Sequence, residues 1–166
     1  MKPIKDIFRS YCVFDAQGRH CNGTDKQSNH AYGDAYNEVK LMMEVGIADG
    51  SSLLAWREVF PNAHCVGMDI HPSDKAHGER LEFHLGDQKS KEDCERAAAG
   101  RGFDFIVEDA THQLADSLVT LLYLWPAVKP GGLYVIEEFA NIGSLRSSVE
   151  ALFQGVDIID VPSPFG

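Results

Sequence analysis

Residues 40–60 read KLMMEVGIADGSSLLAWREVF, and this stretch decides the fold. The apolar run at 40–45 predicts a buried strand, and residues 52–60 predict a helix because their apolar side chains recur at helical spacing. The side chains on that helical face are Leu53, Trp56 and Phe60. A strand, a glycine-containing turn and a helix in this order are typical of the units that build a parallel α/β sheet.

The same order of elements repeats towards the end of the chain. Runs of apolar residues predict further strands near 64–69, 81–85, 103–108, 132–137 and 156–161. Amphipathic stretches predict helices near 89–99, 113–128 and 142–153. We therefore expect a Rossmann-like, open and mostly parallel α/β sheet with helices on both faces, truncated after the sixth strand because no seventh follows.

Polar residues and glycines predict where these elements begin and end. Ser51 or Ser52 is expected to cap the first helix, and Ser90 followed three residues later by Asp93 is a variant of the capping box. The run KPGG at 129–132 predicts a turn that leads into the fifth strand.

The first part of the chain differs in kind from the rest. Residues 1–39 are polar and show little periodicity, so we expect an N-terminal leader or cap segment, followed by one domain over 40–166. Two interpretations remain open: a surface leader, or a segment that folds over the ligand crevice. The second is supported by side chains of ligand-contacting types within it: Thr24, Asp25, Lys26, His30, Tyr32 and Tyr36.

Composition restricts the class of protein. The 166 residues, 44% of them hydrophobic and 24% charged, suit one globular domain with a sizeable core. A net charge of −10 without clustered Lys and Arg disfavours nucleic-acid and anionic-membrane partners. The four cysteines form no CxxC pair, and no signal peptide or membrane-spanning run is present, so we expect a reduced, cytoplasmic setting.

Acidic residues follow the predicted strands at the point where each strand ends. They are Glu44, Asp69, Asp87, Asp109, Glu137 and Glu138. The carboxyl ends of parallel strands form the ligand crevice of an open α/β sheet, so these side chains are expected to build one site. A solvent-facing or helix-capping carboxylate is the alternative for each of them, and for Asp49 we favour that alternative.

The turn after the first strand indicates the type of ligand. Gly46 and Gly50 allow close approach of a ligand, but the turn lacks the third glycine of GxGxxG and has no GK[ST]. Glu44 at its start would repel a pyrophosphate and suits a cationic amine or sulfonium. Asp69 stands where such folds bind ribose hydroxyls, and Asp87 with Gln88 could contact an adenine amino group.

These motifs carry a family resemblance. They are GTDK at 23–26, EVGIADGSSLLAW at 44–56, FPNAHCVGMDI at 60–70, GDQ at 86–88, EDATH at 108–112 and KPGGLYVIEE at 129–138. In this order they resemble the class I S-adenosylmethionine-dependent methyltransferases, and more narrowly the macrocin and mycinamicin type of sugar O-methyltransferase of antibiotic biosynthesis.

The resemblance implies a cofactor, S-adenosylmethionine, and a set of residues that bind it. Residues 44–50, including Glu44, Gly46 and Gly50, would hold the methionine part together with Ser52. Asp69 would bind the ribose, and Asp87 and Gln88 would flank the adenine. Asp109 is expected to border the cofactor as well as a metal.

Methyl transfer to a hydroxyl requires a base and is assisted by a metal. His112 lies three residues beyond Asp109 and suits proton removal at neutral pH. The oxygen donors Asp109, Glu137 and Glu138 suit Mg²⁺, and the resemblance implies the same ligands and the same base. Adjacent strand residues point to opposite faces, so Glu137 and Glu138 reach one ion only if the backbone has left the strand.

Two motifs depart from the pattern of the family. The family commonly reads DDGSH where this chain has EDATH, and Glu-Asp where it has Glu137-Glu138. Neither departure removes a carboxylate from a predicted ligand position. For His112, a surface or helix-capping histidine is the alternative.

The hypothesis that follows is an O-methyltransferase acting on a hydroxyl of a sugar or a related small secondary metabolite. A second hypothesis is a catalytically inactive S-adenosylmethionine-binding module or a truncated relative, because the last strand would lack its partner unless a second copy of the chain covered the edge. Such a homo-oligomer is a further expectation. A nicotinamide-dependent dehydrogenase shares the fold but not the glycine pattern.

Overall fold

The computed structural model describes residues 12–14, 20–23, 39–137, 142–153 and 156–158. Its elements are β1 (Cys12–Phe14), β2 (His20–Gly23), β3 (Leu41–Val45), α2 (Ser51–Val59), β4 (His64–Asp69), β5 (Leu81–Leu85), α3 (Lys91–Ala98), β6 (Phe103–Glu108), α4 (Leu114–Leu124), η1 (Trp125–Ala127), β7 (Val128–Ile136) and α5 (Ile142–Leu152). Within these ranges no helix is long and apolar enough to cross a membrane.

The main sheet has five parallel strands in the order β5-β4-β3-β6-β7. The order reverses beside β3, the first strand of the sheet along the chain, and the strands agree with the predicted ones to within a few residues. The Rossmann-like parallel α/β sheet predicted from the sequence is confirmed. Since all five strands point the same way, their carboxyl ends lie along one edge.

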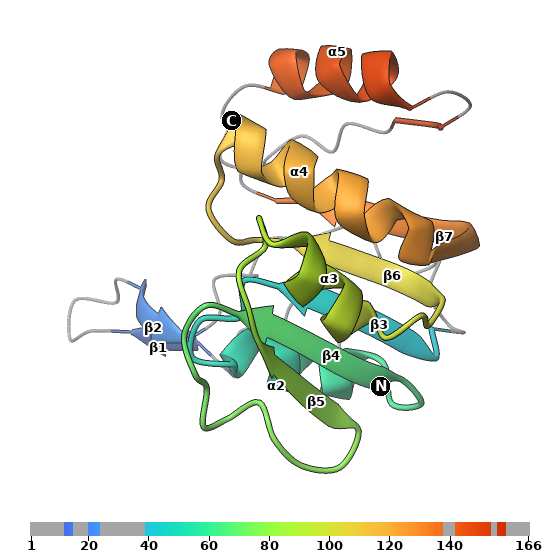
Figure 1. Cartoon of the computed structure of the whole chain (residues 1–166). Helices are drawn as coiled ribbons and strands as arrows, with labels where there is room; N and C mark the ends of the chain where they lie inside the picture. The colour runs from blue at the N-terminus through green and yellow to red at the C-terminus, as the bar shows by residue number, and fades with distance from the viewer. Residues whose placement is uncertain (1–11, 15–19, 24–38, 138–141, 154–155, 159–166) are drawn as a thin grey trace.

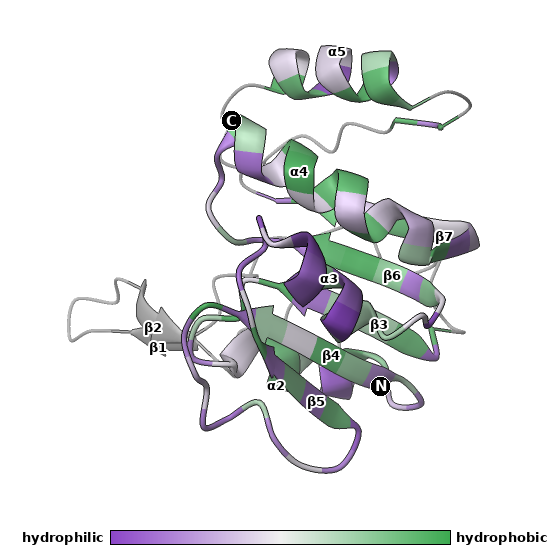
Figure 2. Cartoon of the chain, in the orientation of Figure 1, coloured by the Kyte–Doolittle hydropathy of each residue, from purple (hydrophilic) through white to green (hydrophobic). Residues whose placement is uncertain are grey.

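Helices cover both faces of this sheet. Figure 1 shows α3 and α4 in front of the strands and α2 behind them. On the α2 face, Trp56 stacks on Phe60 and meets the edge of Phe105, so the predicted apolar face of the first helix is buried. The other face is packed by Met43, Met68 and their apolar neighbours. Figure 2 shows α3 as largely hydrophilic, since few of its side chains reach this core.

Several local predictions need correction. The first helix begins after Gly50, and no side chain caps its N-terminus, so Ser51 and Ser52 do not have the predicted role. The run KPGG lies inside β7, where residues 129–132 are accommodated between the pairs Phe103↔Val128 and Phe105↔Leu133. A strand forms there because Val128 can already pair with β6 before the irregularity.

Fewer of the predictions for the two ends of the chain are confirmed. Residues 156–158 form no strand, and 159–161 lie outside the described residues, so a sixth strand is not seen. In the predicted leader, β1 and β2 pair antiparallel, although the sequence showed little strand periodicity there. The ligand-contacting side chains predicted at 24–36 lie outside the described residues, and the cap segment and the domain boundary at 39/40 stay predictions.

A charged cluster covers the exposed edge strand β5. The guanidinium of Arg101 binds both carboxylate oxygens of Glu82, at 2.7 and 3.0 Å, and His64 Nε2 lies 3.0 Å from the same carboxylate. The hydrogen bonds from Arg101 lower the pKa of Glu82 from its ordinary value of 4.5 to about 2. A charged edge of this kind discourages pairing with a strand of another chain.

This cluster predicts how stability changes with pH. Glu82 has a lowered pKa in the folded protein, so its contribution to the free energy of unfolding is present above pH 4.5 and is lost as the pH falls towards 2. Arg101→Gln should therefore be less stable than the wild type above pH 5, and the difference should shrink between pH 4.5 and 2. Urea unfolding across this range measures it. Lys91→Gln, which removes an equal charge from an exposed site, should show no such convergence.

Candidate functional site at the carboxyl edge of the sheet

Backbone hydrogen bonds continue across the sheet beyond the ends of the strands. Each of these bonds runs from the residue after one strand to a carbonyl near the end of its neighbour. They are Gly46 N to Met68 O, Asp109 N to Val45 O, Glu137 N to Glu108 O and Gly86 N to Asp69 O, all of 2.8 or 2.9 Å. The predicted convergence of acidic residues along one edge is thus built into the strand register.

The glycine-containing turn lies at the centre of this edge. Gly46, Ala48 and Gly50 all have positive φ angles, of 86°, 47° and 85°. A Cβ atom on residue 46 would lie 2.4 Å from the carbonyl oxygen of Asp109. Glycine is therefore required at 46 both for its backbone conformation and for the close approach of two loops.

Asp69 connects this turn to the end of β4. Its Oδ2 accepts a hydrogen bond from Ala48 N and its Oδ1 accepts one from His71 N, both at 2.8 Å. A carboxylate has about four acceptor positions, so each oxygen can accept one further hydrogen bond. The predicted ribose contact is compatible with this geometry.

Two apolar side chains next to Asp69 escaped the sequence reasoning. Ile70 follows Asp69 in the sequence, and Leu85 pairs with Asp69 across the sheet. They are 59% and 55% exposed, unlike the other apolar residues of these strands. For Ile70, the signal in the sequence was its position as an apolar residue directly after a strand-end acid. Together they offer an apolar surface beside the predicted ribose site.

Glu44 and Ser52 are brought together, but inside the protein. The Ser52 hydroxyl donates to Glu44 Oε2 at 2.7 Å, and Glu44 has no exposed surface. The pair fastens the start of α2 to the end of β3. The pair lies beneath the glycine turn, and the predicted contact of these two side chains with a ligand stays a prediction.

Asp49 has the structural role that we favoured for it. Its Oδ1 accepts from Ser51 N at 2.9 Å, and Lys75 Nζ donates to its Oδ2 at 2.6 Å. Ser73 donates to the Asp49 carbonyl oxygen. The segment after β4 is thereby fastened to the outside of the glycine turn.

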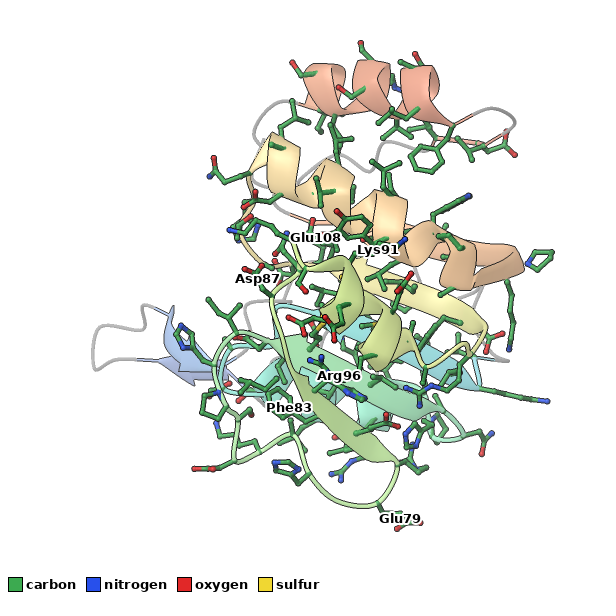
Figure 3. All side chains as sticks on the ribbon, in the orientation of Figure 1. Glu79, Phe83, Asp87, Lys91, Arg96 and Glu108 are labelled. Carbon is green, nitrogen blue, oxygen red and sulfur yellow. The ribbon has the colours of Figure 1, made fainter. Side chains whose placement is uncertain are left out.

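The turn after β5 separates Asp87 from Gln88. The side chain of Asp87 is half-buried and accepts a hydrogen bond from Lys89 N. Gln88 is 4% exposed, and its amide nitrogen donates to Glu108 Oε1 at 3.2 Å and Thr120 Oγ1 at 3.0 Å. Figure 3 shows Asp87 and Glu108 at the same end of the sheet, opposite to Glu79. Asp87 is thus placed for a ligand, whereas the side chain of Gln88 points inward.

The predicted metal and base residues lie on the neighbouring ends of β6 and β7. Glu108 pairs with Ile136, and Asp109 and Glu137 directly follow these residues at the ends of two adjacent strands. Neighbouring strands lie about 5 Å apart, so the backbones of Asp109 and Glu137 are close together. The Oδ1 of Asp109 lies 3.8 Å from Nδ1 of His112. Glu137 follows the end of β7, as binding next to Glu138 would require. Glu138 lies outside the described residues, and within them no three His, Cys, Asp or Glu side chains form a metal site.

His112 has an unusual backbone conformation, with φ of 56°. The left-handed region is disfavoured for side chains other than glycine, although histidine, asparagine and aspartate enter it more often than most residues. Such residues cluster at functional sites, where the surrounding structure holds them in place. The conformation supports a role of His112 in the site.

Comparisons with known proteins show which proteins the chain resembles. No protein-family model matches the chain. The chain is 35% identical over 115 residues to mycinamicin VI 2''-O-methyltransferase of Micromonospora griseorubida, a match that covers 63% of this chain and 28% of that protein. It is 33% identical over 110 residues to demethylmacrocin O-methyltransferase of Streptomyces fradiae, covering 61% and 28%.

A solved structure is similar over more of the chain. It is the MycE methyltransferase of mycinamycin biosynthesis in complex with Mg, SAH and mycinamycin VI, with a TM-score of 0.70 and 25% identity over 87% of this chain and 39% of that one. The chain therefore spans well under half of these relatives. The resemblance to class I methyltransferases of the macrocin and mycinamicin type is confirmed.

The contact at Gly46 predicts a large effect of a small substitution. Gly46→Ala should disrupt the glycine turn, because the new methyl group would meet the backbone of Asp109 and Ala110. Gly100→Ala is the matched control: its φ is also positive, at 67°, but nothing lies within 4 Å of its Cβ position. We expect a loss of about 1 kcal/mol in the free energy of unfolding for Gly100→Ala and a clearly larger loss for Gly46→Ala, as measured by urea unfolding. Equal losses would show that the close approach has no energetic importance.

Proposed function

We propose that this chain is part of an S-adenosylmethionine-dependent O-methyltransferase that acts on a hydroxyl of a sugar unit in a small secondary metabolite. The proposal is carried by one observation: the motifs that resemble this family of sugar O-methyltransferases lie along the carboxyl edge of a parallel sheet, where such folds bind their ligands. The solved relative contains SAH, magnesium and mycinamycin VI.

The residues along this edge suit the three parts of the cofactor. Asp69 retains acceptor positions for ribose hydroxyls, and the exposed side chains of Ile70 and Leu85 suit contact with a purine face. Asp87 would accept a hydrogen bond from the adenine amino group. The turn from Gly46 to Gly50 would hold the methionine part, with Glu44, Ser52 and Gln88 as its buried supports.

The donors at the ends of β6 and β7 fit a magnesium ion. Asp109 and Glu137 offer oxygen atoms on adjacent strand ends, and hard oxygen ligands are those that Mg²⁺ prefers. We assign both as ligands, with Glu138 as the third. When bound, Mg²⁺ would supply positive charge that stabilises a hydroxyl oxygen as its proton leaves.

His112 is the base in this proposal. When bound, S-adenosylmethionine supplies a methyl group on a sulfonium, and its transfer to a hydroxyl leaves S-adenosylhomocysteine and one proton. His112 would take this proton, and Asp109, 3.8 Å from its Nδ1, would help to orient the imidazole. A positioned base of this kind typically contributes about 10²- to 10⁴-fold to a rate.

The alternative of a binding module without catalysis has less support. The relatives that the chain resembles are named as O-methyltransferases, and the Asp109 carboxylate lies 3.8 Å from His112 Nδ1, which supports a catalytic site. The acceptor, a homo-oligomeric state and a cytoplasmic location stay proposals.

Cofactor binding can be tested directly. Calorimetric titration with S-adenosylhomocysteine should show binding, and Asp69→Asn should weaken it about 10- to 100-fold, because hydrogen bonds to a charged group are lost. Asp74→Asn makes the same chemical change on the exposed loop after β4 and should bind as the wild type does. A folded wild-type sample that binds neither S-adenosylhomocysteine nor S-adenosylmethionine would contradict the proposed function.

The role of His112 predicts a different pattern for two substitutions. His112→Asn and His112→Ala should both reduce methyl transfer by about 10²-fold or more, measured with mycinamicin VI and related glycosylated macrolides as trial acceptors. His112→Asn should be the more stable of the two, because asparagine tolerates the left-handed conformation better. Methyl transfer at the wild-type rate by either variant would remove His112 from the mechanism.

A further inference from the structure

The carboxyl group of Glu108 is buried between two turns of the site. Glu108 is 1% exposed, and its Oε1 lies 3.2 Å from the donating Nε2 of Gln88 and 3.4 Å from the donating amide of Ala110. Gln88 follows β5, and Ala110 follows β6. A single carboxyl group therefore connects the turn with the predicted adenine contact to the turn with Asp109 and His112.

The orientation of Gln88 is fixed from the other side. Its Nε2 also donates to Thr120 Oγ1 in α4 at 3.0 Å, and its backbone carbonyl accepts from Cys94 Sγ in α3 at 3.3 Å. Besides Glu108, Gln88 thus has hydrogen-bond partners on two helices, α3 and α4. Its amide group can hold the Glu108 carboxyl in one place.

The turn that Glu108 holds is anchored at both of its ends. Asp109 N bonds to Val45 O at its start, and Thr111 Oγ1 donates to Asp116 Oδ2 at 2.9 Å in an exposed position. Between these two points Ala110 N donates to Glu108 Oε1. His112 follows directly, in its left-handed conformation.

We propose that Glu108 and Gln88 form a buried bridge that positions the turn with Asp109 and His112, and that neither side chain is a ligand of the metal or the cofactor. The bridge makes the turn after β5 a support for the turn after β6. The roles of Asp109 and His112 in this inference rest on the proposed function, whereas the bridge itself does not.

The surroundings of Glu108 support a position inside the core. The Ser117 hydroxyl and the buried hydroxyl of Tyr134 lie beside its carboxyl group. Burial raises the pKa of Glu108, and the hydrogen bonds from Ala110 and Gln88 offset part of this rise. A carboxyl group enclosed in this way has no free approach for a cation from solvent.

Hydrogen exchange measures the bridge without any ligand. Gln88→Met keeps the length of the side chain and removes its N–H groups, so amide exchange in residues 109–113 should accelerate about tenfold, although the substitution is in another loop. Lys89→Met is the matched control, because it changes the exposed neighbour of Gln88 in the same turn and leaves the bond to Glu108; it should change exchange in 109–113 less than twofold. Unchanged exchange in Gln88→Met would overturn the proposal.

A conservative substitution keeps the test decisive if Gln88→Met does not fold. Glu108→Gln retains an oxygen that can accept from both Gln88 and Ala110, so exchange in 109–113 should match the wild type within twofold. Accelerated exchange at 109–113 in this folded variant would contradict a bridge that depends on an acceptor oxygen.

Ligand binding separates this inference from the proposed function. With S-adenosylhomocysteine bound, Gln88→Met should weaken Mg²⁺ binding about tenfold, as is typical when a group that orients a metal ligand is removed. Wild-type affinity for Mg²⁺ in this variant would overturn the positioning role. Absence of S-adenosylhomocysteine binding in the wild type would refute the proposed function, and the exchange result would still decide on the bridge.

Discussion

The structure depends on the way in which the hydrogen-bond ladder continues past the ends of its strands. Because Gly46, Asp109 and Glu137 each donate to the neighbouring strand, three loops leave the sheet in register. The absent side chain at Gly46 then lets the backbone of Asp109 approach closely. The positions of the proposed ribose, metal and base residues follow from these backbone contacts rather than from side-chain flexibility.

Support for the site comes from polar groups buried on both faces of the sheet. Glu44 and Ser52 fasten the glycine turn from the α2 face, and Glu108 with Gln88 fastens the loop after β6 from the α3 and α4 face. Buried polar groups are costly unless they are paired, so their presence next to one edge indicates that the geometry of that edge is under strong constraint. Groups that orient functional side chains are commonly as important as the ligands themselves.

Sequence reasoning located the strands of the sheet and the edge that carries the acids, because apolar periodicity and strand-end carboxylates report directly on a parallel sheet. It did not show which of the polar side chains at this edge are buried. Glu44 and Gln88 have the spacing of ligand-binding residues, but both are buried. Glu44 accepts from Ser52 in the following helix, and Gln88 donates to Thr120, which is distant in sequence. Nothing in the sequence indicated that Glu108 has a supporting position, since its partner Gln88 belongs to another loop. Ile70 and Leu85 were overlooked because exposure cannot be read from an apolar run.

The irregularity in β7 lies at the start of its pairing with β6, at the opposite end from the acidic residues. Four residues, 129–132, fit between two strand pairs that enclose a single residue of β6, and the regular pairing from Leu133 to Ile136 begins only after them. Lys129 meanwhile binds Asp104 at 2.9 Å and holds the near side of the insertion. A change of length in this segment would be absorbed far from the acids, without shifting Glu137 relative to Asp109. Relatives could therefore vary in this segment during evolution while the reactive edge kept its register.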